Sequence, residues 1–414
     1  MAVKPEKKAE RGRLAIHGGK PIQKKPPQQK VLIEDKDIKA VVKVMESGFL
    51  TALSNPVVGE FERKFAEYCG VKYGIAVNSG TAALHVALAA LDVGPGDEVI
   101  VPPYTFIATA SAVLQQNAVP VFADVDPTTL NIDPAEIEKK ITRRTKAIIP
   151  VHIFGLPADM KEINKIAKKR GIPVIEDACQ AHGATIKGKR VGGFGKMACF
   201  SFQESKNLTT GEGGMIVTDD KKLAEKCRII KHIGMAARYE YVTLGYNYRL
   251  PAMSAALGLA HLKKLDAFND HRRNMAEYYS DNLNDLPLEL VNEPTGFRSA
   301  HHLFPIKLAP HLTDSLEKSY EIYCALAAEN VPIWWVYPRP LYQIEFLQER
   351  KAYTKECPFV CKNRNKPHSY KKVKCPVTED VTMRTFVLIT APCYGESVAR
   401  DTVRALKKVL PHFE

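Results

Sequence analysis

The sequence predicts an α/β protein with a mixed, mostly parallel seven-stranded sheet flanked by helices, followed by a smaller C-terminal α+β domain. Apolar runs alternate with helical stretches before residue 220, which is typical of parallel strands with crossover helices. A short turn joins the last two runs, which permits an antiparallel pair. The seven runs begin near Tyr73, Glu98, Val119, Ala147, Pro173, Met197 and Gly214.

Length and composition indicate a multidomain globular protein. At roughly 150 residues per domain, 414 residues predict two or three domains. We expect a basic, partly disordered N-terminal arm over 1–30, a large domain over 31–270 and a small domain over 271–414. A helical pattern from Asp266 to Leu286 leads into the small domain.

Charge and hydropathy exclude several classes of protein. Apolar residues make up 45% of the chain, yet no run of 18 apolar residues predicts a membrane span. The N-terminus has no apolar core of a secretory signal, so we expect a cytoplasmic protein without membrane contact. The net charge is +13, and the arm holds nine Lys and Arg against two Glu. No DNA- or RNA-binding signature accompanies this charge, so we expect no nucleic-acid partner.

A second basic segment, Arg350 to Lys374, could attract a diphosphate or form a solvated loop. It contains Cys357, Cys361 and His368, and Cys375 follows. Their spacing fits no standard zinc signature, and nine cysteines in 414 residues are too dilute for a disulfide scaffold. We therefore expect no metal.

Lys206 is the first candidate for catalysis. It lies in a polar turn between an apolar run ending at Phe202 and a glycine-rich segment that leads into the next run. Apolar surroundings disfavour the charged ammonium and lower its pKa. A neutral amine in such a place can attack a carbonyl and form a Schiff base. A surface lysine is the alternative for the residue taken alone.

Asp177 ends another buried run, Gly171 to Asp177. Ligands of open α/β sheets bind at the carboxyl ends of the strands, where a carboxylate can hold a pyridinium nitrogen in its protonated form. A lysine and such an aspartate are the two groups that a pyridoxal phosphate site requires of the protein. A helix cap is the alternative for Asp177 alone.

A candidate anion site follows the strand that begins at Tyr73. Ser79, Gly80, Thr81 and Ala82 open a helix there. Free backbone N–H groups and the helix dipole favour a phosphate at such a start, and the hydroxyls of Ser79 and Thr81 add donors. The turn lacks the pattern of a nucleotide P-loop and could also be simple capping.

Taken together, these segments resemble the DegT/DnrJ/StrS family of pyridoxal-phosphate sugar aminotransferases. The resemblance runs from about Leu14 to about Leu410. Its segments appear in the family's order: SGTAALHVAL, GDEVIVPPYTFIATASAV, PVFADVD, IIPVHIFGLPADM, EDACQAHGA, the Lys206 turn and GYNYRL. It implies the type I fold of pyridoxal phosphate (PLP)-dependent aminotransferases.

The resemblance also implies roles for individual residues. Lys206 would form the internal aldimine and move the proton, and Asp177 would bind the pyridinium nitrogen. Gln180 would lie near the phenolic oxygen of the cofactor, and Phe106 would stack on its ring. The phosphate-binding residues would be Gly80, Thr81, Ala82, Ser201 and, from a neighbouring subunit, Asn247. A homodimer with shared active sites follows from the last assignment.

The implied reaction transfers an amino group from glutamate or glutamine to a keto group of a nucleotide-linked sugar, with the cofactor passing through pyridoxamine phosphate. A cyclitol ketone, or the chemistry of an aminohydroxybenzoate synthase, is the alternative acceptor chemistry. Val336 and Tyr342 stand where many family members carry histidines, which leaves the acceptor open. A non-catalytic regulatory or nucleic-acid-binding protein is the alternative of another class.

Overall fold

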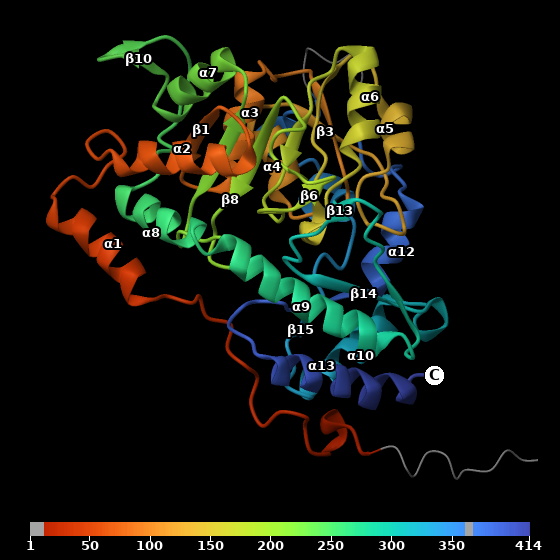
Figure 1. The fold of residues 1–414 in the computed structure, drawn as a ribbon. Coiled ribbons are helices and arrows are strands. Elements are labelled where there is room, and N and C mark those ends of the chain that lie inside the picture. The colour runs from red at the N-terminus through yellow and green to blue at the C-terminus, as the bar shows by residue number, and fades with distance from the viewer. Residues whose placement is uncertain (1–11, 361–366) are drawn as a thin grey trace, which may run out of the picture.

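The computed structural model describes residues 12–360 and 367–414. A larger α/β part and a smaller C-terminal part are connected by a long helix, α9, which runs diagonally along one side of the molecule (Figure 1). The α-helices are α1 (Asp35–Glu46), α2 (Val57–Cys69), α3 (Gly80–Ala90), α4 (Ala108–Gln115), α5 (Pro134–Lys140), α6 (Met160–Arg170), α7 (Lys221–Lys231), α8 (Ala252–Leu262), α9 (Leu265–Leu283), α10 (Leu316–Ala328), α11 (Glu345–Gln348), α12 (Pro376–Arg384) and α13 (Glu396–Val409).

The strands of the larger part follow the predicted alternation. They are β1 (Tyr73–Val77), β2 (Glu98–Val101), β3 (Val119–Phe122), β4 (Thr145–Ile148), β5 (Ile175–Asp177), β8 (Met197–Ser201) and β9 (Gly214–Thr218). The short strands are β6 (Thr185–Ile186), β7 (Lys189–Arg190), β10 (Met235–Ala237), β11 (Glu240–Tyr241) and β13 (Phe297–Arg298). The small domain adds β12 (Leu288–Leu290), β14 (Phe304–Leu308), β15 (Ile333–Trp334) and β16 (Thr385–Leu388).

The main strands form two sheets, ordered β1-β9-β8-β5 and β3-β2-β4. An isolated parallel bridge between Ile148 and Val174 connects them. The neighbours in these sheets are parallel except around β9, which pairs antiparallel with both β1 and β8, as the short turn between the last two runs predicts. The mixed, mostly parallel α/β class is therefore confirmed, while a single sheet of seven strands stays a prediction.

Helices cover both faces of these sheets because successive strand residues point to opposite sides. In β1, Ile75 and Val77 pack into the cluster that contains α3 and α4, whereas Ala76 packs into the cluster that contains α2 and α8. Helix α3 is buried along almost its whole length, which explains why its sequence is apolar on every side. Pro120 is tolerated in β3 because β3 is an edge strand.

The smaller part is an antiparallel sheet, ordered β12-β14-β16-β15, whose apolar core includes residues of α9, α10 and α13. The described part of the N-terminal arm is attached to this core. Glu329 accepts hydrogen bonds from the amides of Ala15 and Ile22, each at 3.0 Å, and pairs with Lys408 at 2.8 Å. Residues 12–30 therefore form a tethered segment, while residues 1–11 of the predicted arm lie outside the described residues.

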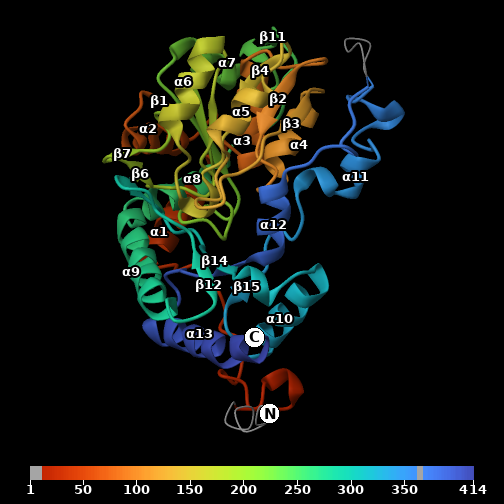
Figure 2. The same cartoon turned by 90° about the vertical axis from the view of Figure 1, so that its right-hand side faces the viewer.

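The segment that contains α11 leaves the small domain and packs against the larger part beside β3 and α4 (Figure 2). Tyr370 donates a hydrogen bond of 2.7 Å to the Pro120 carbonyl and stacks edge-on against Phe122. The predicted boundary at residue 270 therefore stays a prediction, because chain beyond it returns to the large domain. Across the described ranges, no helix is both long enough and apolar enough to cross a membrane.

Candidate active site

A cavity of about 800 Å³ lies at the carboxyl edge of the main sheet and extends toward the small domain. Its large-domain wall includes seven of the predicted site residues, and its opposite wall comes from residues 302–344. The seven are Gly80, Thr81, Phe106, Asp177, Gln180, Ser201 and Lys206. They meet because β1, β5 and β8 are mutually parallel, so their carboxyl ends lie at one edge.

Lys206 sits in the turn between β8 and β9 and lines this cavity together with a smaller one beside it. Its amide donates to the Gln203 carbonyl at 2.9 Å, and the Gln203 side chain accepts from both the amide and the hydroxyl of Ser205. These bonds fix the turn. Burial lowers the pKa of the Lys206 ammonium, and the nearby Asp177 opposes this only in part. The amine is thus biased toward its neutral, nucleophilic form.

Asp177 is 4% exposed at the end of β5. The Thr109 hydroxyl donates to Oδ2 at 2.8 Å, and the Cys179 amide donates to Oδ1 at 3.2 Å. Each carboxylate oxygen keeps a further lone pair, because a carboxylate offers about four acceptor sites. The carboxylate is therefore held in place and can still accept a hydrogen bond from a donor in the cavity.

The start of α3 forms an anion cradle at the other end of the cavity. Ser79 is the N-cap, and its hydroxyl accepts from the Ala82 amide at 3.0 Å. No described acceptor takes the amides of Gly80 and Thr81, as expected for the first turn of a helix. A Cβ at Gly80 would lie 2.7 Å from Cβ of Ser201, so only glycine lets the serine approach. The Ala82 amide already donates to the Ser79 hydroxyl, and the role of Ala82 as a phosphate ligand stays a prediction.

Two further predicted residues define the sides of the cavity. The ring of Phe106 is 57% exposed and lines the cavity, so its face is available for stacking. Gln180 accepts from the Phe154 amide at 2.9 Å and donates to the Tyr337 hydroxyl at 3.3 Å. Tyr337 in turn packs against Tyr104 and Phe154. Gln180 therefore connects the end of β5 to the loop of the small domain.

Asn247 lies apart from the other predicted residues. It is exposed and does not line the cavity of its own chain. Its backbone forms an isolated bridge with His232, just after α7. A phosphate contact from Asn247 therefore requires a second copy of the chain and stays a prediction.

Sequence reasoning missed several residues that build the site. Thr109 holds Asp177, Tyr337 holds Gln180, and Gln29 of the N-terminal segment lines both cavities. The segment GDEVIVPPYTFIATASAV contains Thr109, but nothing in its local pattern shows that this hydroxyl points to a carboxylate 68 residues away.

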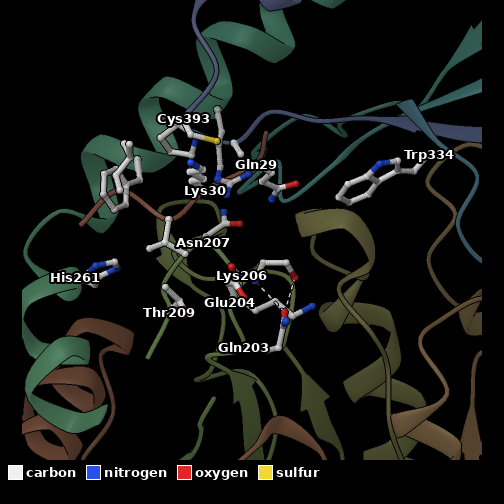
Figure 3. Close-up of a pocket in the computed structure, with 17 residues that line it drawn as sticks. Gln29, Lys30, Gln203, Glu204, Lys206, Asn207, Thr209, His261, Trp334 and Cys393 are labelled. Atoms are coloured by element: carbon white, nitrogen blue, oxygen red, sulfur yellow. Dashed lines mark hydrogen bonds between the residues drawn. The ribbon is translucent and has the colours of Figure 1, made fainter. Parts of the chain in front are cut away.

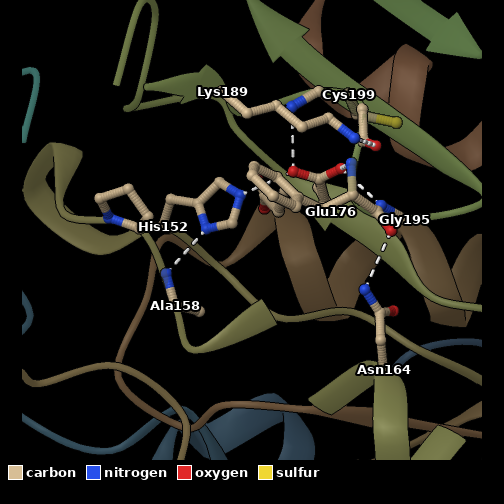
Figure 4. Close-up of polar contacts among 12 residues, drawn as sticks. His152, Ala158, Asn164, Glu176, Lys189, Gly195 and Cys199 are labelled. Carbon is tan, nitrogen blue, oxygen red and sulfur yellow. Dashed lines mark hydrogen bonds and ion pairs between the residues drawn. The ribbon is translucent and has the colours of Figure 1, made fainter. Parts of the chain in front are cut away.

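A buried polar network surrounds Glu176, the residue before Asp177 (Figure 4). Glu176 accepts from the amides of Gly192, Phe194 and Gly195 at 2.7–2.9 Å and from Nε2 of His152 at 3.1 Å. The Ala158 amide donates to Nδ1 of that histidine, which places the ring proton on Nε2 and makes the ring neutral. Burial raises the pKa of Glu176, but these donors outweigh it and hold the pKa below its usual range. His152 is fully buried and uses both ring nitrogens in this network, which is typical of a structural histidine.

The described cysteines lie apart from other groups that bind metals. Among the residues that the structure describes, no three His, Cys, Asp or Glu side chains are grouped as metal ligands would be. Cys375 is buried, and Cys357 lies 3.8 Å from the Asn117 side-chain oxygen. Cys361 of the segment considered for zinc lies outside the described residues.

These residues fit pyridoxal phosphate. The cavity offers an amine with a lowered pKa, a fixed carboxylate, an exposed aromatic face and a helix start flanked by the hydroxyls of Thr81 and Ser201. Gly80 lets Ser201 approach the start of α3, which places the serine hydroxyl beside the free amides that favour a phosphate. Each group matches one part of the cofactor: the aldehyde, the ring nitrogen, the ring face and the phosphate.

Comparison with known proteins agrees with this geometry. A GDP-perosamine synthase of Caulobacter vibrioides is 42% identical over 71% of this chain and 80% of its own. A UDP-N-acetyl-3-dehydro-alpha-D-glucosamine 3-aminotransferase of Acidithiobacillus ferrooxidans is 47% identical over 68% and 74%. The solved structure of NtdA from Bacillus subtilis with bound cofactor PMP superposes with a TM-score of 0.79 at 30% identity, covering 94% of this chain and 87% of that one.

The family model of the DegT/DnrJ/EryC1/StrS aminotransferases matches residues 31–385. This range includes every predicted site residue, from Gly80 to Asn247. The α/β fold with its antiparallel C-terminal sheet is shared with solved structures of PLP-dependent aminotransferases. The chain belongs to the DegT/DnrJ/EryC1/StrS aminotransferase family.

Proposed function

We propose that this aminotransferase uses pyridoxal phosphate to move the amino group of glutamate or glutamine to a keto group of a nucleotide-linked sugar. The observation that carries the proposal is that Lys206 and Asp177 line the same cavity, one with a lowered amine pKa and one with a fixed carboxylate. This pair supplies what the cofactor needs from the protein.

Each residue has a distinct task in this proposal. Lys206 binds the cofactor covalently through Nζ between cycles and, once released, carries the proton to and from the substrate carbon. Asp177, fixed by Thr109, keeps the ring nitrogen protonated. The amides of Gly80 and Thr81 and the Ser201 hydroxyl bind the phosphate. The chemistry that the cofactor supplies when bound is an electron sink next to the reacting carbon.

The acceptor is proposed from the two curated relatives, whose names specify a GDP-linked and a UDP-linked sugar product or substrate. A cavity of about 800 Å³ has room for such a ligand besides a cofactor. Arg339 is exposed on the cavity wall and forms no described ion pair, so its guanidinium is available to a diphosphate.

Adding pyridoxal phosphate and then L-glutamate or L-glutamine tests the donor half of the reaction. We expect the absorption band of the lysine-bound cofactor to bleach with one of the two donors and one equivalent of 2-oxo acid to form per site. Adding a keto sugar nucleotide should then restore the band and yield an amino sugar. If neither donor yields a 2-oxo acid, the proposed function is wrong.

We also propose that the enzyme is a homodimer whose sites are shared between subunits. Two exposed apolar segments project to the same side of the large domain in Figure 1, α1 with its following loop and the β10–β11 hairpin with its flank. The exposed apolar residues of these two segments are Ile38, Val42, Met45, Phe49, Leu50, Leu53, Tyr239, Tyr241, Val242 and Leu244. Exposed apolar residues that project to one side of a protein favour an interface there. Asn247 follows the hairpin by a few residues.

Mixing two inactive variants tests this sharing. We expect Asn247→Asp to be inactive because its charge repels the phosphate, and Lys206→Ala to be inactive because it lacks the amine. A mixed dimer has one site with Lys206 from one chain and Asn247 from the other, so activity should return after subunit exchange. No recovery in verified mixed dimers would contradict the shared site, because each site would then keep one of the two defects.

A further inference from the structure

Beside the main cavity lies a smaller one, of about 230 Å³, whose walls include Lys206, Gln29, Lys30 and Arg272 (Figure 3). In Figure 3, Gln29 and Lys30 of the N-terminal segment lie across this space from Lys206. The space is too small for a nucleotide-linked sugar and suits a molecule the size of an amino acid. Because Lys206 lines both cavities, a ligand in the smaller one still reaches the reacting amine.

Arg272, on α9, is 3% exposed. Its Nη1 donates to the His302 carbonyl and to the Thr390 hydroxyl, both at 3.2 Å. Its Nε is buried and has no hydrogen-bond partner, and among the described residues no acceptor takes Nη2. These two groups form one edge of the guanidinium, the edge that binds a carboxylate through two parallel hydrogen bonds.

The charge of Arg272 is also uncompensated. No described carboxylate forms an ion pair with it, and burial lowers its pKa to about 10. The charges of Lys206 and Arg272 both act on His302 and His182, whose pKa values burial and these charges depress, that of His182 to about 3. Arg272, and Lys206 whenever it is protonated, therefore place positive charge beside the same pair of neutral imidazoles. A buried charge without a partner is costly, so this region favours an anionic ligand.

The acidic residue in the lining of the small cavity, Glu204, does not neutralise Arg272. Glu204 lines the small cavity but is exposed and forms no described ion pair, while Lys30 adds a further exposed positive charge. Among the described residues, no donor reaches the buried side-chain oxygen of Gln29, so a flip of this amide that turns its NH2 group toward a ligand would break no described hydrogen bond of that oxygen.

We propose that Arg272 binds the α-carboxylate of the amino-acid donor in this smaller cavity, with Gln29 beside it. The proposal rests on the proposed function, since it names the donor subsite of the same reaction. Glutamate and glutamine share the α-carboxylate as their common anion, so the subsite serves either donor. The donor carbon that carries the amino group is bonded to this carboxylate, which places that carbon between Arg272 and Lys206.

Binding of two unreactive ligands to the cofactor-loaded enzyme tests the subsite without relying on activity. L-2-Hydroxyglutarate carries the α-carboxylate and 4-hydroxybutanoate lacks it. By calorimetry we expect the first to bind the unsubstituted enzyme roughly 100-fold more tightly, as a lost charged and bidentate contact implies. Equal affinities would overturn the proposal even if no variant of Arg272 folds.

Three variants assign the effect to Arg272. Arg272→Gln should weaken L-2-hydroxyglutarate binding by roughly 100-fold and leave 4-hydroxybutanoate binding within about threefold. Arg272→Lys should recover part of the loss, since lysine restores the positive charge but cannot form the two parallel hydrogen bonds of a guanidinium. The matched control is Arg273→Gln, which removes the adjacent, partly exposed arginine that bonds the Ser299 carbonyl and Glu293. It should bind both ligands normally.

The donor half-reaction separates this proposal from the proposed function. With glutamate, Arg272→Gln should require about 100-fold more donor for half-maximal rate while its limiting rate changes much less. If the unsubstituted enzyme converts the donor but Arg272→Gln and Arg273→Gln have the same donor dependence, the subsite is wrong and the function stands. If the unsubstituted enzyme converts no donor, the proposed function itself fails.

Discussion

Replacing Lys206 with alanine is expected to abolish turnover, with a fall of at least about 10²–10⁴-fold from the loss of the proton carrier alone. Covalent binding of the cofactor is lost as well, so the true fall should be larger. The fold should remain, because the backbone bonds of the turn come from Gln203, Ser205 and the Lys206 amide, which alanine keeps. Steady-state assays with either donor measure the loss.

The matched control is Lys196→Ala, ten residues earlier. Lys196 is half exposed, pairs with Asp220 at 2.7 Å on the surface, and lines neither of the two cavities that Lys206 lines. We expect activity close to that of the unsubstituted enzyme and a change in the free energy of unfolding of at most about 1 kcal/mol. Lys206→Ala with normal turnover would contradict the assignment of the catalytic amine.

The largest effect on stability is expected for Glu176→Gln. Each Glu176 oxygen accepts two hydrogen bonds, and all four come from groups that can only donate in this arrangement. A glutamine must point its NH2 group at two of these donors, which leaves them unpaired in the core. We expect the free energy of unfolding to fall by about 3–5 kcal/mol. Denaturant unfolding measures this loss.

The same carboxylate gives the stability a defined pH dependence. The pKa of Glu176 in the folded protein lies below its usual value of 4.5, so the carboxylate stabilises the fold fully above that value. The contribution is lost as the pH falls through the lowered pKa. Glu176→Gln should remove this part of the acid transition. Glu162→Gln, at an exposed residue paired with Lys165, is the control and should change the unfolding free energy by less than about 1 kcal/mol. An equal loss of unfolding free energy in both variants would show that the buried hydrogen bonds of Glu176 contribute no more than an exposed ion pair.

The elements with clear local signals were predictable. Helix α5 has such signals, because Asp133 caps its start and proline occupies its first position. The predicted helix Asp266–Leu286 ends earlier, at Leu283, because the chain turns there and Leu286 bonds back to Leu283. Ends of this kind depend on tertiary contacts that a periodic pattern does not record.

Those residues of the candidate site that lie at the ends of parallel strands were predictable. Asp177, Ser201 and Gly80 all lie where a parallel strand stops, so their meeting follows from the topology. Arg272 was not predictable, because the pair Arg272-Arg273 on an amphipathic helix does not reveal which side chain is buried. Gln29 belongs to an arm that composition alone marks as disordered, yet Glu329 tethers this arm.

The most direct test of the central claim is to locate the cofactor on the chain. The purified enzyme is incubated with pyridoxal phosphate, reduced with borohydride, digested and analysed by mass spectrometry. The account predicts a single reduced adduct, on the peptide that contains Lys206, and its loss when the donor is added before reduction. An adduct on other lysines with Lys206 left unmodified would contradict the account.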